Sequence, residues 1–582
     1  MVIEIFVSSR ASPQAIKHKK EMLMSRQSRR SNSPLARLLD RLQWAHRQSE
    51  LTGIPTDELL DMRTEQEQQA ASQRQLHGNR RDFIKTVGAG IAGAGLLGAM
   101  GPALAAMGGQ GSNPGRVIVI GAGLAGLRCA HRLQQYGYPC KVYEANTRIG
   151  GRAFTTRNFF DEGMAVERGG ELVSTEHSAL RNLVHQLGLS LEDVNSGGTP
   201  GSEELYQVNN QFYREAELRA DWRQIYELFK RTQQAAPWQP VYNNHNAEHA
   251  RLDWINATDW LDQVGIGANS NFGQLMQANL ISEYGHAPQA QTCLNLVYLL
   301  AFNSINEPLP LAGTDERYHI VGGSDSVVTA LLNQLPAGTV ATSKALTSIG
   351  GSPNGPYVCS FSDGSSDICD QLVLALPFSK LREVAIAPEI LASFSPAKRR
   401  AINEMSLGAN GKIHIQCGSR PWNATRYIEG QAVPTGGVSY SGAEGFVTVW
   451  DTQVNQPSTG SVLCNYLGGN QGRALSTSVP FAQAATSDVN RLLGQIEPVF
   501  PGTTAAYQGK ALVSKWAINP WSLGSYAAPA LGHYTSFWGA QWETDAGNRI
   551  HFCGEHCSQE FWGFLNGAVE TGERAAQALV QG

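Results

Sequence analysis

The stretch Val117–Arg152, "VIVIGAGLAGLRCAHRLQQYGYPCKVYEANTRIGGR", decides the fold of this 582-residue chain. Its first four residues are all apolar, as in a parallel strand that is buried on both faces. Gly121, Gly123 and Gly126 follow in the spacing G-x-G-x-x-G, at the point where a strand turns into a helix. This pattern predicts a tight glycine turn and a helix whose N-terminus faces a bound phosphate.

A second strand is predicted at Cys140–Tyr143, and Glu144 follows it directly. In a dinucleotide-binding unit a carboxylate at this place accepts hydrogen bonds from ribose hydroxyls. Ala125 and Ala145 lie next to these residues and belong to the same predicted site. A strand, a glycine turn, a helix, a second strand and an acid in this order predict a bound dinucleotide, either NAD or FAD.

Two more glycine-rich pieces favour FAD over NAD. They are "GGR" at 150–152 and "ERGGE" at 167–171. NAD does not need these additions, whereas a flavin needs further backbone amides and glycines around its pyrophosphate and isoalloxazine. The predicted FAD-binding residues therefore include Gly151, Arg152, Gly169, Gly170 and Glu171.

The C-terminal stretch "RIHFCGEHCSQEFWGFLNGAVETGERAAQALV", 549–580, allows two interpretations. Cys553, His556 and Cys557 could bind a metal, or the stretch could be a short strand followed by a helix. A metal site needs these three side chains to converge with a fourth ligand, whereas Cys553 is more simply explained as a small apolar residue at the end of a strand. We therefore expect no metal.

These pieces together resemble the flavin amine oxidase superfamily, which includes monoamine oxidases, L-amino-acid oxidases and polyamine oxidases. The similarity runs from Arg116 to the C-terminus and is strongest at the two ends of that span. It implies an α/β fold with a Rossmann-like FAD-binding domain built from discontinuous segments, plus an α+β substrate-binding domain. The C-terminal residues in step with the family are Phe552, Gly554, Glu555, Gly563, Phe564, Leu565, Gly567, Ala568, Gly572, Glu573 and Arg574.

The resemblance also implies how the chain is divided. The FAD-binding domain would comprise 113–195, the return segment 311–380 and the C-terminal part 541–582, and the substrate domain would comprise 196–310 and 381–540. Apolar residues at helical spacing predict a mostly helical region between Asn195 and Pro310. In the return segment, Gly322 and Gly323 should precede a helix, and strands are expected in "YVCSFSDG" and "QLVLALP".

Further site residues follow from the same resemblance. Leu346, Trp516, Gly554, Glu555, Phe564, Leu565 and Ala568 would contact FAD, with the helix near Leu565 directing its amides at flavin N1 and the C2 carbonyl. Lys412 would hold a water at flavin N5, and Tyr526 and Phe564 would flank the substrate amine. Taken alone, the lysine would be interpreted as solvated surface and the aromatic residues as core.

Two departures from the family bear on cofactor and substrate. Ser525 stands where monoamine oxidases carry the cysteine that bonds to FAD, so FAD should be bound noncovalently. Leu172 occupies the slot where L-amino-acid oxidases usually place an arginine for the substrate carboxylate. Either another arginine serves, or the substrate is a plain amine; Glu171 is a candidate contact for a basic substrate tail.

The N-terminal region carries an export pattern. Residues 79–107 hold paired arginines, a Gly/Ala/Leu run and a small-residue "ALA" site, which resembles a twin-arginine signal. Twin-arginine export carries folded proteins, which suits an enzyme that loads its cofactor first, and predicts a periplasmic or extracellular location. Residues 1–78 are basic and polar, and we expect them to be disordered or removed.

The expected function is FAD-dependent oxidative deamination of a primary amine or L-amino acid, with O₂ reduced to H₂O₂. A carotenoid-type desaturase or isomerase, and an exported flavoprotein without catalysis, remain alternatives. A formal net charge of -4 argues against a nucleic-acid partner, and hydrophobic residues at 42% are ordinary for a folded protein. No stable membrane span is expected after signal removal, and association as a homodimer stays open.

Overall fold

The computed structural model describes residues 115–194, 202–305, 314–456, 458–544 and 549–581. The expected N-terminal extension, 1–78, and the expected export signal, 79–107, lie outside the described residues. Within the described part of the chain, no helix is long and apolar enough to cross a membrane.

A parallel five-stranded sheet forms the base of the predicted FAD-binding domain, in the order β23-β13-β1-β2-β9. All four residues of its central strand β1 are buried, as the apolar run predicts. The five strands come from distant parts of the chain, so the Rossmann-like domain of discontinuous segments is confirmed. Their bounds are β1 (Val117–Ile120), β2 (Cys140–Tyr143), β9 (Val340–Ala341), β13 (Gln371–Leu374) and β23 (Ile550–Phe552).

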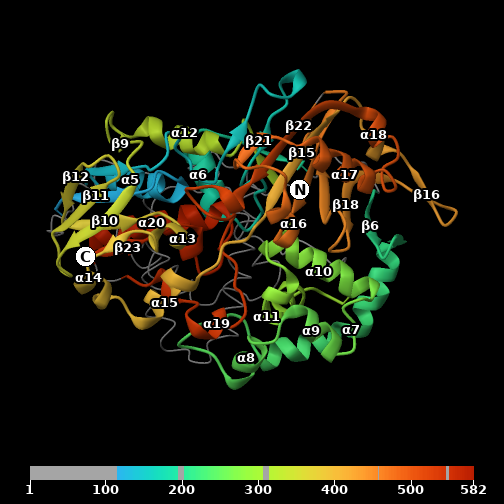
Figure 1. The fold of residues 1–582 in the computed structure, drawn as a ribbon, viewed down its shortest axis with the longest axis horizontal. Helices are drawn as coiled ribbons and strands as arrows, with labels where there is room; N and C mark the ends of the chain where they lie inside the picture. The colour runs from blue at the N-terminus through green and yellow to red at the C-terminus, as the bar shows by residue number, and fades with distance from the viewer. Residues whose placement is uncertain (1–114, 195–201, 306–313, 457, 545–548, 582) are drawn as a thin grey trace, which may run out of the picture. The chain divides into compact units, whose positions relative to one another are not determined.

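Four helices accompany this sheet, and two of them come from opposite ends of the described chain. In Figure 1 the blue helix α5 and the red helix α20 belong to the same part of the molecule. They cross closely, since a Cβ added to Gly572 of α20 would lie 2.3 Å from the carbonyl oxygen of Ala125 in α5. The helices are α5 (Leu124–Gln135), α6 (Ser178–Gln186), α12 (Asp325–Gln334) and α20 (Leu565–Gln581); α12 follows Gly322 and Gly323, as predicted.

A four-stranded sheet, in the order β12-β11-β10-β14, adjoins the return segment. Its strands are β10 (Leu346–Gly351), β11 (Tyr357–Phe361), β12 (Ser366–Cys369) and β14 (Ala385–Ile386). Because β14 pairs with β10, this sheet includes residues a few positions beyond 380, where the return segment was expected to end. Two short pairs lie nearby: β3 (Thr155–Thr156) with β4 (Val166–Glu167), and β5 (Leu191–Asp193) with β8 (Tyr318–Ile320).

The other large sheet has eight strands, in the order β21-β22-β15-β20-β19-β18-β6-β7. All its pairs are antiparallel except β18 with β6. The strands are β6 (Glu203–Val208), β7 (Gln211–Tyr213), β15 (Gly411–Cys417), β18 (Thr435–Ser441), β19 (Thr448–Asp451), β20 (Ser461–Leu467), β21 (Phe481–Gln483) and β22 (Tyr507–Lys515); β16 (Arg426–Ile428) pairs separately with β17 (Gln431–Val433).

Helices complete this second part of the molecule. The green set in Figure 1 comprises α7 (Glu215–Ala235), α8 (Ala247–Leu252), α9 (Ala257–Gln263), α10 (Asn271–Tyr284) and α11 (Cys293–Leu300). Later in the chain follow α13 (Phe378–Leu381), α14 (Pro388–Ser393), α15 (Pro396–Glu404), α16 (Gly469–Ala474), α17 (Thr486–Ile496), α18 (Thr503–Ala506) and α19 (His533–Ser536).

The expectation of a mostly helical region between 195 and 310 omits one hairpin, formed by β6 and β7. The strands are joined by Asn209 and Asn210, whose φ angles are 50° and 60°. Two consecutive positive φ angles are those of a type I′ turn, which matches the twist of antiparallel strands, and asparagine tolerates them. The Asn-Asn pair was therefore a hairpin signal that helical periodicity in the neighbouring residues obscured.

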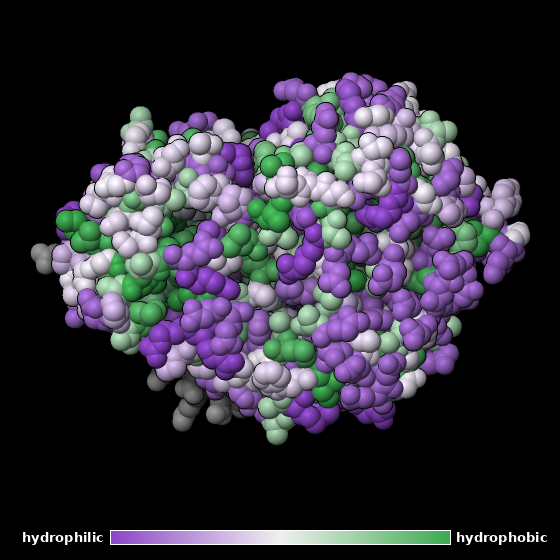
Figure 2. Space-filling model, in the orientation of Figure 1, coloured by the Kyte–Doolittle hydropathy of each residue, from purple (hydrophilic) through white to green (hydrophobic). Residues whose placement is uncertain are grey.

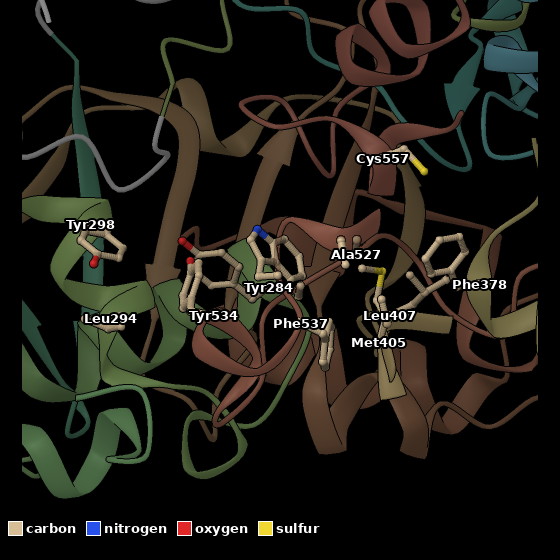
Figure 3. Close-up of a cluster of buried hydrophobic side chains, with 14 of the residues drawn as sticks. Tyr284, Leu294, Tyr298, Phe378, Met405, Leu407, Ala527, Tyr534, Phe537 and Cys557 are labelled. Atoms are coloured by element: carbon tan, nitrogen blue, oxygen red, sulfur yellow. The ribbon is translucent and has the colours of Figure 1, made fainter. Parts of the chain in front are cut away.

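One large apolar core joins the two parts. It runs from Leu294 and Tyr298 of α11, past Tyr534, to Phe378 and Cys557 near the parallel sheet (Figure 3). A shared core of this kind holds the elements around the site in one arrangement. The face drawn in Figure 2 is mostly polar, with apolar residues in scattered groups.

Candidate active site

The glycines of the first turn are required by close backbone approach. Gly121 has a φ of 106°, and a Cβ there would lie 2.8 Å from the carbonyl oxygen of Ala375. A Cβ on Gly126 would lie 1.9 Å from the carbonyl oxygen of Gly121. Neither position accepts a side chain, so the turn brings the N-terminus of α5 close to the end of β1.

The N-terminus of α5 has the properties of a phosphate site. Gly123 is its N-cap, no side chain caps it, and its first turn holds no acidic residue. A Cβ added to Gly123 would meet only the Cα of Gly151, at 4.0 Å, so the space beside the helix end is open. Open space beside uncapped amides and a positive helix end suits the pyrophosphate of FAD.

Glu144 accepts hydrogen bonds from the glycine turn and still has free positions for further hydrogen-bond donors. Its Oε2 accepts a hydrogen bond from the amide of Ala122 at 2.8 Å, and its Oε1 accepts one from Asn146 at 2.8 Å. Burial raises the pKa of this carboxyl group, although these amides oppose the shift. A carboxylate offers about four acceptor positions, so two remain for the ribose hydroxyls of FAD. Leu346 begins β10 two residues after Lys344, whose amide donates to the carbonyl of Glu144.

An ion pair between Arg152 and Glu555 ties four segments together. Nη1 of Arg152 lies 2.5 Å from Oε1 of Glu555 and 2.9 Å from the carbonyl oxygen of Ser525. Glu555 also accepts hydrogen bonds from the amides of Ala527, at 3.2 Å, and Gly563, at 2.6 Å. Burial acts to raise the pKa of Glu555, but the charge and hydrogen bond of Arg152 and the amide of Gly563 act together against it, and the pKa is lowered. Glu555 therefore stays ionised at the centre of this junction.

Gly169 and Gly170 lie where two of the expected FAD contacts converge. A Cβ on Gly169 would lie 1.9 Å from the carbonyl oxygen of Arg152 and 3.1 Å from the ring of Trp516. A Cβ on Gly170 would lie 2.9 Å from the side chain of Leu565, at the start of α20. The glycine-rich loop thus lies against both the tryptophan and the C-terminal helix. Ala568 lies one turn further along α20.

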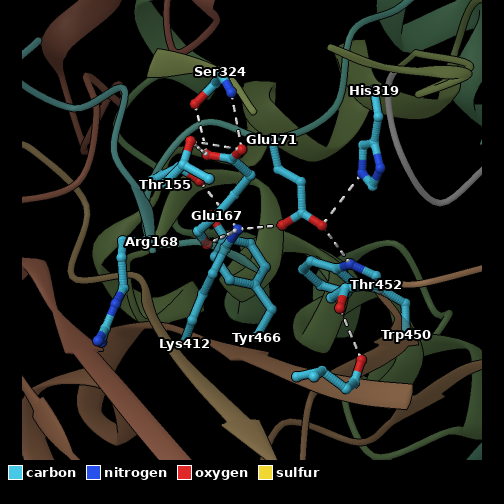
Figure 4. A network of polar contacts seen from close by, with 12 residues as sticks. Thr155, Glu167, Arg168, Glu171, His319, Ser324, Lys412, Trp450, Thr452 and Tyr466 are labelled. Carbon is cyan, nitrogen blue, oxygen red and sulfur yellow. Dashed lines mark hydrogen bonds and ion pairs between the residues drawn. The ribbon is translucent and has the colours of Figure 1, made fainter. Parts of the chain in front are cut away.

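Lys412, on β15, is deeply buried and fully hydrogen bonded (Figure 4). Its Nζ lies 2.5 Å from Oε2 of Glu171, and 3.1 Å and 3.0 Å from the carbonyl oxygens of Glu167 and Gly169. Burial acts to lower the pKa of Lys412, but the charge and hydrogen bond of Glu171 and the charge of Glu167 act together against it, and the pKa is raised. An ammonium group has three hydrogens, so a water at flavin N5 would have to displace one of these acceptors.

Glu171 uses both of its oxygens. Oε1 accepts a hydrogen bond from Nε1 of Trp450 at 3.1 Å and lies 3.4 Å from Nε2 of His319, while Oε2 faces Lys412. Burial would raise the pKa of Glu171, but the charge of Lys412 and the contact with His319 lower it well below its ordinary value. Both oxygens already have partners in the protein, so the carboxylate is not available to a substrate tail in this arrangement.

The expected aromatic walls have different neighbours. The hydroxyl of Tyr526 donates to the carbonyl oxygen of Ser282 at 2.8 Å and lies 2.9 Å from the hydroxyl of Tyr466. The ring of Phe564 packs on His177, with centroids 4.8 Å apart and planes tilted by 55°. The Tyr526 ring also lies 3.4 Å from where a Cβ of Gly563 would be, so the two wall segments meet at this glycine.

Ser525 and Leu172 mark the two departures from the family. The hydroxyl of Ser525 donates to Oδ1 of Asn410 at 2.7 Å, so it is held by a neighbouring side chain. Leu172 is half-buried and follows Glu171 directly. The hydrogen-bonded serine fits a noncovalently bound cofactor. Leu172 places an apolar side chain where L-amino-acid oxidases usually have an arginine for the substrate carboxylate.

The "CGEHC" stretch is part of the core. Cys553 and Cys557 are buried, and His556 packs edge-on against Phe378 with centroids 4.7 Å apart. Among the residues that the structure describes, no three His, Cys, Asp or Glu side chains converge as metal ligands. The stretch instead forms the turn from β23 to the Glu555 junction.

The fold and the site together define a flavoprotein oxidoreductase. Residues 124–580 match the family model described as flavin containing amine oxidoreductase, and the chain belongs to this family. FAD is the cofactor of the family, and the glycine cradle, the uncapped helix end and the spare acceptors of Glu144 fit it. The enzyme is therefore an FAD-dependent oxidoreductase of the amine-oxidising class.

Individual relatives are distant but cover most of the chain. Nicotine dehydrogenase of Pseudomonas putida is 24% identical over 533 residues, 86% of this chain and 97% of that protein. L-amino-acid oxidase of Mus musculus is 24% identical over 499 residues, which are 80% of this chain and 70% of that protein. Among solved structures, cyclohexylamine oxidase from Brevibacterium oxydans has 19% identity and a TM-score of 0.66, covering 80% of this chain and 99% of that one. The structural likeness shows the shared fold.

Several residues of the site carried no signal in the sequence. Tyr466 pairs with Lys412 across β20 and β15, and Trp450 and His319 reach Glu171 from β19 and β8. Strand pairing over such distances leaves no local pattern, so only the folded chain could reveal these contacts. The roles of Lys412, Tyr526 and the other predicted site residues in binding and catalysis stay predictions.

Proposed function

We propose that this protein oxidises a primary amine, using noncovalently bound FAD, with O₂ as electron acceptor and H₂O₂ as product. The observation that carries the choice of amine is electrostatic. The negative charge of Glu283, and that of Glu316 when it is ionised, act on the hydroxyls of Tyr526, a residue of the expected substrate wall, and of its neighbour Tyr466. A cationic or neutral amine is compatible with these charges, whereas a substrate carboxylate would be repelled.

The chemistry divides between cofactor and protein. FAD supplies two-electron oxidation of the carbon next to the amine and passes the electrons to O₂. The aromatic side chains Tyr526, Tyr466 and Phe564 would hold the substrate in a pocket with little water and fix the orientation of its C–H bond. Arg152 and Glu555 would hold the glycine loop and the start of α20 in place around the cofactor.

L-amino-acid oxidation is the second candidate, because relatives of that activity cover most of this chain. It requires a cation for the substrate carboxylate in an otherwise low-dielectric pocket, since an unpaired buried charge is costly. Leu172 supplies none, and Lys412 is already paired with Glu171. Amino acids should therefore be poorer substrates than the corresponding amines.

The test is anaerobic bleaching of the flavin absorption by matched pairs of compounds. Phenethylamine with L-phenylalanine, and cadaverine with L-lysine, differ only by a carboxylate. We expect the amine of a pair to bleach the flavin, and admission of air to restore the colour and produce peroxide. Bleaching by the amino acids alone would overturn the amine proposal. Bleaching by a polyene and by none of these compounds would favour the desaturase alternative.

The noncovalent state of FAD has its own test. Acid precipitation of the wild-type protein should release all flavin into the supernatant, since Ser525 offers no thiolate and its hydroxyl is bonded to Asn410. The control variant Ser525→Cys restores the residue type that monoamine oxidases use at this position. Flavin retained in the wild-type pellet would contradict the proposal.

Export by the twin-arginine route is proposed from the sequence of residues 79–107 alone. Replacing Arg80 and Arg81 with lysine keeps the charge but removes the arginine pair. We expect the precursor of this variant to stay in the cytoplasm with FAD bound, whereas the wild-type protein appears in the periplasm or medium. The same distribution of the variant and the wild-type protein between cytoplasm and periplasm or medium would contradict the export proposal.

A further inference from the structure

A chain of hydrogen-bonding groups leads outward from Lys412 (Figure 4). The side chains of Lys412 and Glu171 are 6% and 5% exposed, and His319 beyond them is 20% exposed. Oε2 of Glu171 faces Lys412 at 2.5 Å, and its Oε1 faces Nε2 of His319 at 3.4 Å. One carboxylate thus bridges a buried ammonium group and an imidazole that is partly open to solvent.

The proposed reaction requires protons to cross the closed pocket. An ammonium substrate, R–CH₂–NH₃⁺, becomes R–CH=NH₂⁺ by losing two electrons and two protons. Both electrons and one proton pass to FAD, and the second proton has to leave the site. The reduction of O₂ to H₂O₂ takes two electrons and two protons, so one proton has to return from outside in each turnover.

We propose that Glu171 and His319 form a proton relay between Lys412 and solvent. The inference rests on the proposed amine oxidation. On the inward path Lys412 first gives a proton to the pocket. His319 then passes its proton to Oε1 of Glu171, and rotation of the carboxyl group brings this proton to the neutral Lys412. The outward path runs in reverse. Each transfer moves one proton between a nitrogen and an oxygen atom, and uptake of a proton from solvent by His319 returns the relay to its starting state.

The surroundings of His319 favour this role. The imidazole lies 3.4 Å from Glu171, and the negative charges of Glu167 on β4 and of Glu192 on the paired strand β5 also act on it. Burial acts to lower the pKa of His319, but the contact with Glu171 and these negative charges together outweigh it and the pKa is raised. An imidazole accepts a proton on one ring nitrogen and donates one from the other, as a relay requires.

Trp450 limits the other routes from Glu171. Its Nε1 donates to the same Oε1 at 3.1 Å, and an indole N–H does not exchange a proton at neutral pH. In its ionised form the carboxylate is therefore held with one oxygen toward Lys412 and the other toward His319. Of the hydrogen bonds and ion pairs that Glu171 makes with described residues, those with Lys412 and His319 involve titratable groups, and the negative charges of Glu171 and Glu316 also act on each other.

The first test measures the coupling without turnover. The imidazole signals are followed by NMR from about pH 5 to about pH 9 in the oxidised holoenzyme, with His319 assigned by its loss in His319→Gln. We expect Glu171→Gln to lower the pKa of His319, and Lys412→Met to raise it, because the carboxylate then loses its other cation. An unchanged pKa in both variants would overturn the relay.

The second test measures proton delivery. The holoenzyme is reduced with dithionite and mixed with O₂, so no amine substrate is needed. We expect His319→Gln to slow the return of flavin colour about tenfold and to flatten its dependence on pH, because glutamine cannot carry the proton. His245→Gln is the control, since His245 is exposed and contacts a backbone carbonyl.

The outcomes separate the relay from the proposed function. Failure of every amine to bleach the flavin would reject the amine substrate, yet the reoxidation rates would still report on the relay. Equal rates and equal pH profiles for His319→Gln and the wild type would reject the relay even if amines are oxidised. If Glu171→Gln does not fold, Lys412→Met still measures the coupling and His319→Gln still measures proton delivery.

Discussion

Glu316 brings a second carboxyl group close to Glu171, and the two cannot both be ionised without cost. Burial, and then the negative charge of Glu171, raise the pKa of Glu316 to about 7, although Lys412 opposes the shift. The side chain is half-buried in a region where the charges of Asp315 and Glu204 also act on it. Glu316 therefore changes its charge near neutral pH, beside the expected substrate wall.

Replacing Glu316 with glutamine should change how stability depends on pH. A carboxyl group whose pKa is raised on folding favours the folded state fully below its ordinary pKa, near 4.5, and loses this contribution as pH rises through about 7. The melting temperature of Glu316→Gln, relative to wild type, should therefore be higher at pH 8 than at pH 5. Thermal unfolding at both pH values measures it, with exposed Glu444→Gln as control. A pH-independent difference would contradict the assignment.

Tyr526 illustrates the difference between a hydroxyl and a ring. Tyr526→Phe removes the hydrogen-bond donor to the carbonyl of Ser282, which should lower the free energy of unfolding by about 1 kcal/mol.

Tyr526→Ala also removes the aromatic ring that is expected to flank the substrate, and should reduce kcat/KM about tenfold or more, equivalent to about 1.4 kcal/mol. Chemical denaturation and steady-state kinetics measure the two effects. Tyr427→Phe, at a side chain that is 77% exposed, should change neither; equal effects of all three would refute the role of Tyr526.

The crossing of α5 and α20 is the element-scale feature on which the site depends. The first of these helices carries the phosphate end of the predicted FAD site, and the second carries Leu565 and Ala568. They approach closely at Gly572 because that residue has no side chain. A glycine inside a helix normally lowers stability, so its presence in α20 is explained by the packing and not by helix propensity.

Two glycine-to-alanine changes should therefore have opposite signs. At Gly494 of α17 nothing lies within 4 Å of an added Cβ, so Gly494→Ala should stabilise the protein by about 0.5–1 kcal/mol. At Gly572 the added Cβ would lie 2.3 Å from the carbonyl oxygen of Ala125, so Gly572→Ala should destabilise by about 1–3 kcal/mol. Denaturant unfolding compares them. Stabilisation by both changes would show that the helices can separate without cost.

At the scale of the whole molecule, FAD would act as a link between distant segments. The predicted contacts lie on the turn after β1, at the end of β2, in the loop after β4 and at the start of α20. The apolar core by itself already spans the parallel sheet and the helical part. We therefore expect the FAD-free chain to fold but to be less stable than the holoenzyme.

Removal of FAD should lower the melting temperature, and readdition should restore it in proportion to the logarithm of the free concentration. A ligand at 100 times its Kd stabilises the folded state by about 2.7 kcal/mol if it binds only that state. Thermal scans of the stripped protein over a series of FAD concentrations measure this, with NAD as control ligand. A response to NAD equal to that of FAD would contradict the assignment of the site.

Local patterns were sufficient for the phosphate site and insufficient for the substrate side. Gly121, Gly126 and Glu144 form one turn and its neighbouring strand, so their spacing predicted their arrangement. Lys412 was singled out by resemblance, yet its partner Glu171 could not be inferred, because the two are joined by sheet packing across 241 residues. The Asn209-Asn210 hairpin was a local signal that helical periodicity obscured.

The sequence by itself determined the βαβ unit, the identity of the dinucleotide and the family, because glycine spacing and strand hydrophobicity act over a few residues. Only the tertiary structure decided that Lys412 is paired, that Tyr466 joins Tyr526, and that His319 reaches Glu171. These contacts form between strands that are remote in the chain, where register and burial select the neighbours. Their charges and hydrogen bonds are therefore properties of the folded molecule.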